Sequence, residues 1–197
     1  MRKVIAALMV SLDGFIEGPN GELDWVETWE DPFNILHQID TCILGRVMYP
    51  GYEQYWQAIL TNPKGVLPIT GRIASEGEIE YAKFAEKTPH IVLSKTLDHV
   101  GWKNTRIVRD VEEIRKLKQQ AGKDMHAVGG ATLVSSLMNA GLIDELRLVV
   151  VPIVLGGGKP LFKDLKKRHV LRFLEATPLE SGLVRLSYNT TARPVRV

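Results

Sequence analysis

The segment from His126 to Phe162 constrains the fold of this chain more than any other stretch. Its first residues, 126–128, run directly into Gly129-Gly130. A helical pattern follows, ends at Ala140-Gly141, and leads into an almost unbroken apolar run from Leu146 to Leu155. A strand, a glycine turn, a helix and a buried strand in this order predict a βαβ unit, in which the two strands lie parallel in one sheet.

The glycine pair lies where the first strand of this unit ends and its helix begins. Backbone N–H groups at a helix N-terminus carry partial positive charge, so a phosphate can dock there, close to the chain. Gly129 and Gly130 therefore predict a phosphate contact, although tight packing of the helix on the strand also explains a glycine pair in this position.

The rest of the chain predicts more strands and helices in alternation. Four apolar runs indicate buried strands, namely Val4–Val10, Thr41–Leu44, His90–Leu93 and Thr105–Val108, and Val111–Ala121 has the apolar spacing of a helix. Two alternating segments near the end, Val170–Ala176 and Leu183–Asn189, predict an antiparallel pair. We expect one α/β domain over residues 1–197, with a mostly parallel central sheet flanked by helices and an antiparallel C-terminal hairpin.

Less regular structure is expected in between. Residues 15–30 form a loop around Gly18-Pro19-Asn20-Gly21, and its Trp25 and Trp29 either line a ligand cleft or cover the edge of the core. Asp31-Pro32 predicts the N-cap and first position of a short helix that reaches Gln38. Residues 60–79 indicate an irregular excursion with room for one short strand, and Tyr81–Glu86 a helical turn.

Composition excludes several classes of function. The net charge of +2 gives no electrostatic reason to expect nucleic acid or an anionic membrane as a partner. No segment approaches the roughly 18 apolar residues of a membrane span, and the single cysteine, Cys42, is typical of a reducing compartment. The five histidines show no ligand spacing, so we expect no metal site, and we expect a cytoplasmic protein.

Three predicted strands end in residues that suit phosphate or ribose contacts. These residues are Gly45-Arg46, Ser94-Lys95-Thr96 and Gly129-Gly130. Ligands of open α/β sheets bind at the carboxyl ends of the strands, so three such sites on one edge suit an elongated ligand such as a dinucleotide. Each site also has an ordinary alternative, because Arg46 can be solvated and residues 94–96 can form a plain turn. The spacing fits neither the three-glycine dinucleotide fingerprint nor the phosphate loop that ends in Gly-Lys-Ser/Thr.

Taken together and in this order, the motifs of the chain resemble a known family. The motifs are Ser11-Leu12-Asp13-Gly14-Phe15-Ile16, Leu44-Gly45-Arg46 with Tyr49, Val92-Leu93-Ser94-Lys95-Thr96-Leu97, Val128-Gly129-Gly130, Leu142-Ile143-Asp144-Glu145-Leu146, Pro152, and Gly157-Gly158-Lys159-Pro160-Leu161-Phe162. Over nearly its whole length the chain resembles the dihydrofolate-reductase-like superfamily. The resemblance is to the reductase domain of the bifunctional riboflavin-biosynthesis deaminase–reductase and its stand-alone bacterial relatives in particular.

The resemblance implies an NADPH-dependent reductase. Gly45 and Arg46 would face the cofactor phosphates, and Ser94 and Lys95, with Thr96 beside them, would hold the adenosine 2′-phosphate. The pyrophosphate and the nicotinamide side would be approached by Gly129, Gly130, Ala131 and Thr132. Many relatives have Thr two residues after the Arg, whereas this chain has Met48, so one hydroxyl contact to phosphate is lost.

The resemblance leaves the proton donor open. Counting from Trp25, the carboxylate that supports protonation would be Glu30 or Asp31, and Asp13 at the end of the first strand could also face the substrate. Each candidate also has an ordinary alternative. Asp31 can be a helix N-cap, Asp13 can stabilise its own turn, and Glu30 can simply be exposed.

The expected reaction is reduction of the ribosyl group of an aminouracil phosphate to the ribityl form. The alternatives are a reductase of pterins or other small heterocycles, and a nucleotide-binding protein with little turnover. The apolar run from Leu146 to Leu155 and the family resemblance predict a homodimer.

Overall fold

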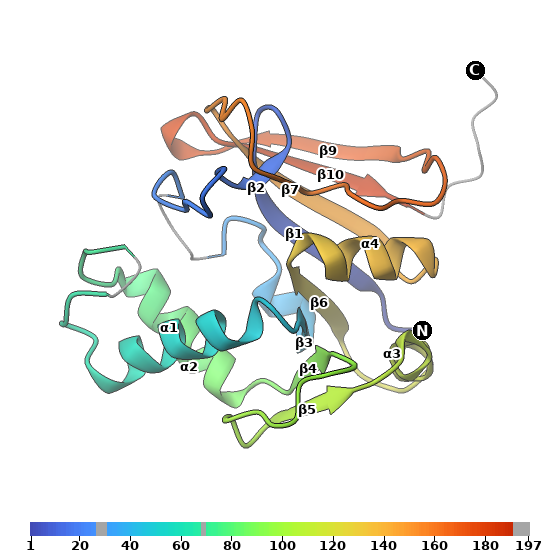
Figure 1. Cartoon of the computed structure of the whole chain (residues 1–197), viewed down its shortest axis with the longest axis horizontal. Helices are drawn as coiled ribbons and strands as arrows, with labels where there is room; N and C mark the ends of the chain where they lie inside the picture. Colours follow the sequence, from blue (N-terminus) through green and yellow to red (C-terminus); the bar gives the residue numbers. More distant parts are fainter. Residues whose placement is uncertain (27–30, 68–69, 191–197) are drawn as a thin grey trace.

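The computed structural model describes residues 1–26, 31–67 and 70–190 of the chain. In these residues eight strands form one sheet in the order β5-β4-β3-β6-β1-β7-β10-β9 (Figure 1). The parallel strands are β1 (Val4–Ser11), β3 (Ile39–Gly45), β4 (His90–Leu93), β5 (Thr105–Val108), β6 (Asp124–Gly129) and β7 (Glu145–Val151). The antiparallel strands are β9 (Arg172–Pro178) and β10 (Val184–Asn189). The predicted fold class, a mostly parallel sheet with an antiparallel C-terminal hairpin, is confirmed.

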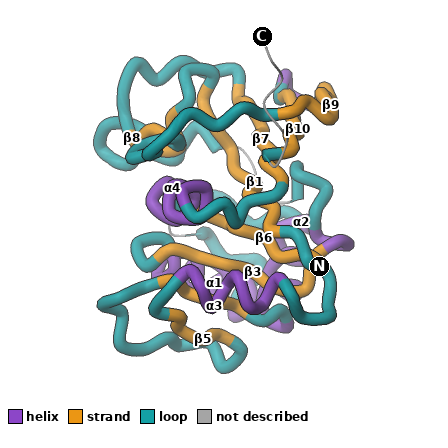
Figure 2. Tube along the Cα trace, turned by 90° about the vertical axis from the view of Figure 1, so that its right-hand side faces the viewer, coloured by secondary structure: helices purple, strands orange, loops and turns teal. Residues whose placement is uncertain are grey.

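The sheet is covered on both faces. Alternate residues of β1 point to opposite sides, so Val4, Ala6 and Leu8 join one apolar cluster while Ile5 and Ala7 join the other. Helices α3 (Val111–Lys118) and α4 (Ala131–Asn139) contribute to the first cluster, and α1 (Tyr49–Thr61) and α2 (Glu76–Lys87) to the second. Figure 2 shows α4 lying along the middle of the sheet beside β1 and β6. No helix in the described ranges is long and apolar enough to cross a bilayer.

A second, two-stranded sheet joins two loops that the sequence left unpaired. It consists of β2 (Phe15–Glu17) and β8 (Lys159–Pro160). The triple glycine precedes β8, and a Cβ atom on Gly158 would lie 2.1 Å from the carbonyl oxygen of Glu17. Gly158 has φ +131°, so both its backbone and its contact require glycine. The triple glycine thus forms a bend that holds these loops together.

The helical turn predicted at residues 81–86 lies within helix α2, which begins earlier, so the prediction that the irregular stretch reaches residue 79 is wrong. The helix begins at a capping box in which the Ser75 hydroxyl accepts from the Glu78 N–H and the Glu78 carboxylate accepts from the Ser75 N–H. The Ser-x-x-Glu signal lay inside the stretch interpreted as irregular. The remainder of that stretch holds one isolated bridge between Val66 and Ile73.

The short helix predicted from Asp31 to Gln38 is also not formed as an α-helix. The structure has turns followed by a 3-10 helix, η1 (Leu36–Gln38). The Asp31 carboxylate accepts from the N–H groups of Ile35 at 2.8 Å and Leu36 at 2.9 Å, so Asp31 does cap the segment. Asn34 has φ +53°, a left-handed conformation that interrupts a helix between the cap and η1.

Candidate functional site

A cavity of about 1270 Å³ opens at the carboxyl ends of β3, β4 and β6. Pockets for one drug-sized ligand measure roughly 300–1,000 Å³, so this cavity has room for a longer ligand or for two ligands side by side. Its wall is formed at one end by residues that follow these strands and at the other end by α1 and by Leu23, Val26, Pro32, Phe33 and Ile35. We refer to the two ends as the strand-end half and the aromatic half.

The strand-end half brings together the three segments that the sequence singled out. Eight of the nine predicted cofactor residues line the cavity, namely Gly45, Arg46, Ser94, Lys95, Thr96, Gly130, Ala131 and Thr132. The ninth, Gly129, lies directly beside it, because a Cβ atom there would approach the sulfur of the cavity-lining Met48 to 3.2 Å. The segments share one groove, and their role in binding a cofactor stays a prediction.

The ends of β3 and β6 lie close together at this edge. A Cβ atom on Gly45 would lie 3.5 Å from the carbonyl oxygen of Gly129 and 3.4 Å from the Cβ of Leu133, which are ordinary van der Waals distances. Gly129 has φ +138°, which side-chain-bearing residues rarely adopt, and a Cβ atom there would lie 3.1 Å from a methyl carbon of Leu8. Glycine is therefore required at position 129, where β6 ends beside the cavity.

Three helices start at this edge of the sheet, and the two that follow β3 and β6 have open N-termini. Helix α1 begins after Met48 and α4 after Gly130, and neither has a capping side chain or an acidic residue in its first turn. In contrast, α2 is capped by Ser75 and α3 by Asp110, and both carry glutamates in the first turn. The unsatisfied N–H groups and positive helix dipoles of α1 and α4 therefore favour an anionic ligand in the cavity.

Cationic side chains add to this positive potential. Arg46 and Lys95 form no ion pair with any carboxylate among the described residues, whereas Lys159 in the same cavity is paired with Glu17 at 2.5 Å. Sequence reasoning missed another cation of the cavity wall, Arg109, which follows β5 as Arg46 follows β3. The argument that singled out Arg46, a cation directly after a predicted strand, would also have identified Arg109.

The turn after β4 is shaped by its own side chains. The Ser94 hydroxyl oxygen accepts from the N–H groups of Thr96 at 3.2 Å and Leu97 at 2.9 Å. The guanidinium of Arg109 donates to the carbonyl oxygens of Ser94 at 2.9 Å and Leu97 at 2.7 Å. Ser94 and Arg109 thus fix the loop from which Lys95 projects as an exposed cation.

The aromatic half has a different character. Its wall includes the rings of Phe33, Tyr52, Tyr55, Trp56 and Tyr81. Trp56 packs on Tyr55 with ring centroids 4.9 Å apart and on Tyr81 with centroids 4.4 Å apart. Tyr52, Tyr55 and Trp56 recur at helical spacing on one side of α1, and this spacing was the signal in the sequence that could have identified them.

One imidazole lies among these residues. His126 is 2% exposed and its ring centroid is 6.2 Å from that of Phe33. Its Nε2 is 3.2 Å from the carbonyl oxygen of Ala7, which can only accept, so Nε2 donates. Burial lowers the pKa of His126 to about 4, so the ring is neutral near pH 7.

The predicted catalytic residues are not brought to the cavity wall in the described part of the chain. The Asp13 carboxylate accepts from the Ser11 hydroxyl at 2.6 Å and from the N–H of Gly156 at 2.8 Å, and the Ser11 hydrogen bond contributes most to lowering its pKa. The Ser11 hydrogen bond lies within the turn of Asp13, as in its alternative role, and the Gly156 hydrogen bond also ties the end of β1 to the triple-glycine bend. Glu30 lies outside the described residues, so its position does not enter the argument.

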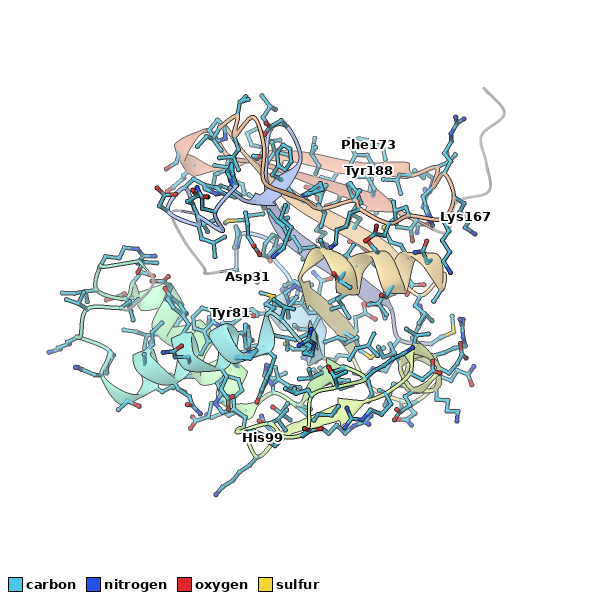
Figure 3. The ribbon with its side chains drawn as sticks, viewed as in Figure 1. Asp31, Tyr81, His99, Lys167, Phe173 and Tyr188 are labelled. Atoms are coloured by element: carbon cyan, nitrogen blue, oxygen red, sulfur yellow. The ribbon has the colours of Figure 1, made fainter. Side chains whose placement is uncertain are left out.

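The two loop tryptophans were expected either to line a cleft or to cover the core. Trp25 is buried with Val149, Val151 and Leu183 in a separate apolar cluster and does not line the cavity. Its indole N–H donates to the carbonyl oxygen of Glu22 at 3.1 Å. Trp25 therefore covers the core edge, and Trp29 lies outside the described residues. Figure 3 shows Asp31, from the 31–38 segment, and Tyr81, from α2, near the middle of the molecule.

Comparison with known proteins decides the family. Residues 2–185 match the RibD C-terminal domain family. The chain belongs to this family. It is 38% identical to the uncharacterized protein YyaP of Bacillus subtilis (strain 168) over 95% of each chain.

Solved structures agree on the fold of this RibD C-terminal domain. A putative riboflavin biosynthesis protein from Shewanella sp. PV-4 is similar with a TM-score of 0.67 at 21% identity, over 96% of this chain and 99% of that one. Dihydrofolate reductase from Enterococcus faecalis, solved with NADP(H), is similar with a TM-score of 0.60 at 16% identity, over 96% and 97%. The resemblance to the dihydrofolate-reductase-like superfamily predicted from the motifs is confirmed.

Proposed function

We propose that this RibD C-terminal domain is an NADPH-dependent reductase that acts on a small heterocyclic substrate. Membership of the family supports a reductase. The observation that carries the proposal is the division of one cavity into a cationic half at the strand ends and an uncharged aromatic half. A polyanionic cofactor requires positive potential, and a planar ring requires flat apolar surface on which to stack.

The residues of the strand-end half fit a nicotinamide dinucleotide phosphate. The open N-termini of α1 and α4 offer backbone donors to phosphate groups, and Arg46 lies at the start of α1 with no carboxylate partner in the described chain. Lys95, supported by Ser94 and Arg109, would contact the 2′-phosphate. When bound, the cofactor supplies the hydride.

The remaining residues orient the substrate and exclude water. The rings of Tyr52, Trp56 and Tyr81 present flat apolar surface on which a heterocycle can stack. Positioning of donor and acceptor then supplies much of the catalysis. For the proton we keep Glu30 as the first proposed donor, since in the sequence it precedes residues 32–35, which contribute to the cavity wall. Asp13 is the second, since its carboxylate is already held by Ser11 and Gly156.

The first substrate we propose is 5-amino-6-(5-phosphoribosylamino)uracil, whose ribosyl group would be reduced to the ribityl form. The family resemblance implies this reaction, and the similar Shewanella protein is named for riboflavin biosynthesis. The second is a dihydropterin, which the aromatic half favours. Consumption of NADPH with each substrate would separate these two. NADPH binding without turnover on either would instead favour a nucleotide-binding protein.

Lys95→Ala tests the cofactor assignment. Loss of a charge-assisted contact to the 2′-phosphate should weaken NADPH about ten-fold and leave NADH within about two-fold. Lys103→Ala removes an exposed lysine that does not line the cavity and serves as the matched control. Equal losses for the two cofactors would show that Lys95 does not distinguish them.

We also propose a homodimer, with β9 as its contact. In the described chain β9 pairs with β10 alone and is an edge of the sheet. Phe173 is 58% and Leu174 40% exposed there, and Figure 3 shows Phe173 beside Tyr188 on the outer side of the hairpin. An exposed apolar edge strand is a template for pairing with a second copy. A monomeric mass in sedimentation at micromolar concentration would exclude this dimer.

A further inference from the structure

The segment that walls the aromatic half gains little support from the backbone of its neighbours. Pro32, Phe33 and Ile35 of this segment line the cavity. In the described part of the chain, no backbone–backbone hydrogen bond joins residues 31–35 to the main sheet or to helices α1 and α2. Backbone polar groups that leave water need partners, so the shape of this wall depends on the side chains that reach it.

One arginine on β7 holds two carbonyl groups of this segment. Nη1 of Arg147 donates to the carbonyl oxygens of Phe33 at 3.2 Å and Asn34 at 2.9 Å. Nη2 donates to the side-chain oxygen of Gln38 at 2.8 Å, and Nε donates to the Glu145 carboxylate at 2.6 Å. Every nitrogen of the guanidinium is therefore engaged, and its planar fork bridges β7 and the segment above it.

Arg147 lies behind the wall and not on it. Its side chain is 12% exposed, and the residue does not line the cavity. Arg147 and Val149 are alternate residues of β7, so both point to the face of the sheet on which Phe33 packs against the cluster of Val149. Arg185 of β10 pairs with Val149 and donates to the carbonyl oxygen of Pro32 at 3.4 Å. Two guanidinium groups of the sheet thus hold three consecutive carbonyl groups of the wall segment.

The backbone of Asn34 shows what these contacts maintain. Asn34 has φ +53°, a left-handed conformation that is unfavourable for residues other than glycine. The residue is exposed, and its side chain forms no hydrogen bond in the described chain, whereas its carbonyl oxygen accepts from Arg147 and, at 2.8 Å, from the Gln38 amide. Because Asn34 lies between Phe33 and Ile35, its conformation decides where both of these side chains lie on the cavity wall.

We infer that Arg147 is a positioning residue for the aromatic half. By holding the carbonyl oxygens of Phe33 and Asn34, it keeps the wall in the shape that receives a planar ring. The inference rests on the proposed function, because the aromatic half is the substrate half of the same cavity. Arg147 acts through the wall and does not touch the ligand. Its loss should therefore weaken binding of a heterocycle and spare NADPH, whose phosphates belong to the strand-end half.

Two variants disturb the wall by independent routes. Arg147→Lys keeps a positive charge beside Glu145, but a single ammonium group cannot reproduce the planar fork. Arg106→Lys, on the edge strand β5 and outside the cavity, is its matched control. Asn34→Ala removes no side-chain hydrogen bond of the described chain and makes the left-handed conformation less favourable. Asn34→Gly permits that conformation and is the matched control.

The measurements are the dissociation constants of 7,8-dihydropterin and of NADPH, and hydrogen exchange in the ligand-free protein. We expect Arg147→Lys and Asn34→Ala to weaken dihydropterin roughly three- to ten-fold and to leave NADPH within about two-fold. The N–H groups of Ile35 and Leu36, which the Asp31 carboxylate accepts, should exchange roughly ten-fold faster in both variants, because the segment opens more often. Arg106→Lys and Asn34→Gly should behave as wild type.

Unchanged exchange at Ile35 and Leu36 in Arg147→Lys would overturn the inference. Equal losses of dihydropterin and NADPH would also overturn it, because they would show a general loosening of the fold. If wild type binds neither dihydropterin nor the aminouracil substrate, the proposed function fails. Faster exchange in Arg147→Lys would in that case still support the role of Arg147 in holding the wall, so the two failures are distinguishable.

Discussion

The two halves of the cavity are built from different kinds of group. The strand-end half presents backbone N–H groups and exposed cations such as Arg46 and Lys95, which need only follow a strand to be in place. The aromatic half presents rings from α1 and α2 and a neutral imidazole from β6, which meet only after the sheet and both helices have packed. The placing of the cations is thus local in the sequence, while the shape of the aromatic half is a property of the tertiary structure.

Acid should affect the aromatic face of the sheet most strongly. Burial lowers the pKa of both His90 and His126 to about 4, from an ordinary value of 6.5. The unfolded chain therefore binds more protons than the folded one between these values, so stability is full above pH 6.5 and is lost as pH falls toward 4. Each histidine can contribute about 1.4 kcal/mol per pH unit in this window.

Urea unfolding at pH 7, 6 and 5 measures this loss. The free energy of unfolding should fall with decreasing pH, with a slope that approaches the value for two protons bound on unfolding. His126→Gln should reduce this slope to about the value for one proton. A flat stability profile from pH 7 to 5 would mean that the aromatic face admits charge, and the contrast between the two halves would disappear.

Arg46→Ala should have the largest effect on the strand-end half. One charge-assisted hydrogen bond to phosphate contributes about 1.5–3 kcal/mol, so the NADPH dissociation constant should rise by roughly 10- to 100-fold. Stability should change little, because Arg46 is exposed and forms no ion pair in the described chain. Calorimetric titration provides the measurement.

Arg168→Ala is the matched control, since Arg168 is exposed, forms no ion pair in the described chain and does not line the cavity. If both arginine variants weaken NADPH equally, the effect comes from net charge and not from a contact at the start of α1. The affinity of wild type should also fall with salt, whereas dihydropterin binding should not.

This contrast explains what the sequence could predict. Gly45-Arg46, Ser94-Lys95 and Gly129-Gly130 were identified because each follows an apolar run, and parallel strands bring their carboxyl ends to one edge. His126 was only an unremarkable member of a predicted strand. Its environment depends on Phe33 and Ala7, which precede it by 93 and 119 positions in the sequence.

Two local errors have the same origin. The capping box at Ser75 lies among Gly and Pro residues that indicate loops, and helix α2 forms because Arg72 and Tyr55 bind the Glu78 carboxylate from outside the helix. In the 31–38 segment Asp31 caps the chain as predicted, but the left-handed backbone conformation of Asn34 prevents a continuous helix. In both cases a contact from elsewhere in the sequence accompanies the difference, because Arg147 donates to the carbonyl oxygens of Phe33 and Asn34.

Asp13→Asn separates the catalytic and structural predictions for Asp13. The carboxylate accepts from Ser11 and from the N–H groups of Leu155 and Gly156, and its lowered pKa shows that these hydrogen bonds favour the charged form. We expect a lower urea midpoint and a kcat within a few-fold of wild type. The destabilisation should diminish as pH falls, because protonation of the wild-type carboxylate removes the same advantage. A large loss of kcat with an unchanged midpoint would instead assign Asp13 to the reaction.

The smallest expected effect is a gain at Met48, where many relatives have Thr. Met48 precedes the first turn of α1 and provides no capping hydrogen bond, and its sulfur lies against Gly129. Met48→Thr adds a hydroxyl at the open helix end, and one further neutral hydrogen bond should tighten NADPH about two- to five-fold. Met48→Val has the same shape without the hydroxyl and should leave the affinity unchanged. An equal gain in both variants would mean that the length of the Met side chain, and not the missing hydroxyl, limits phosphate binding at this helix.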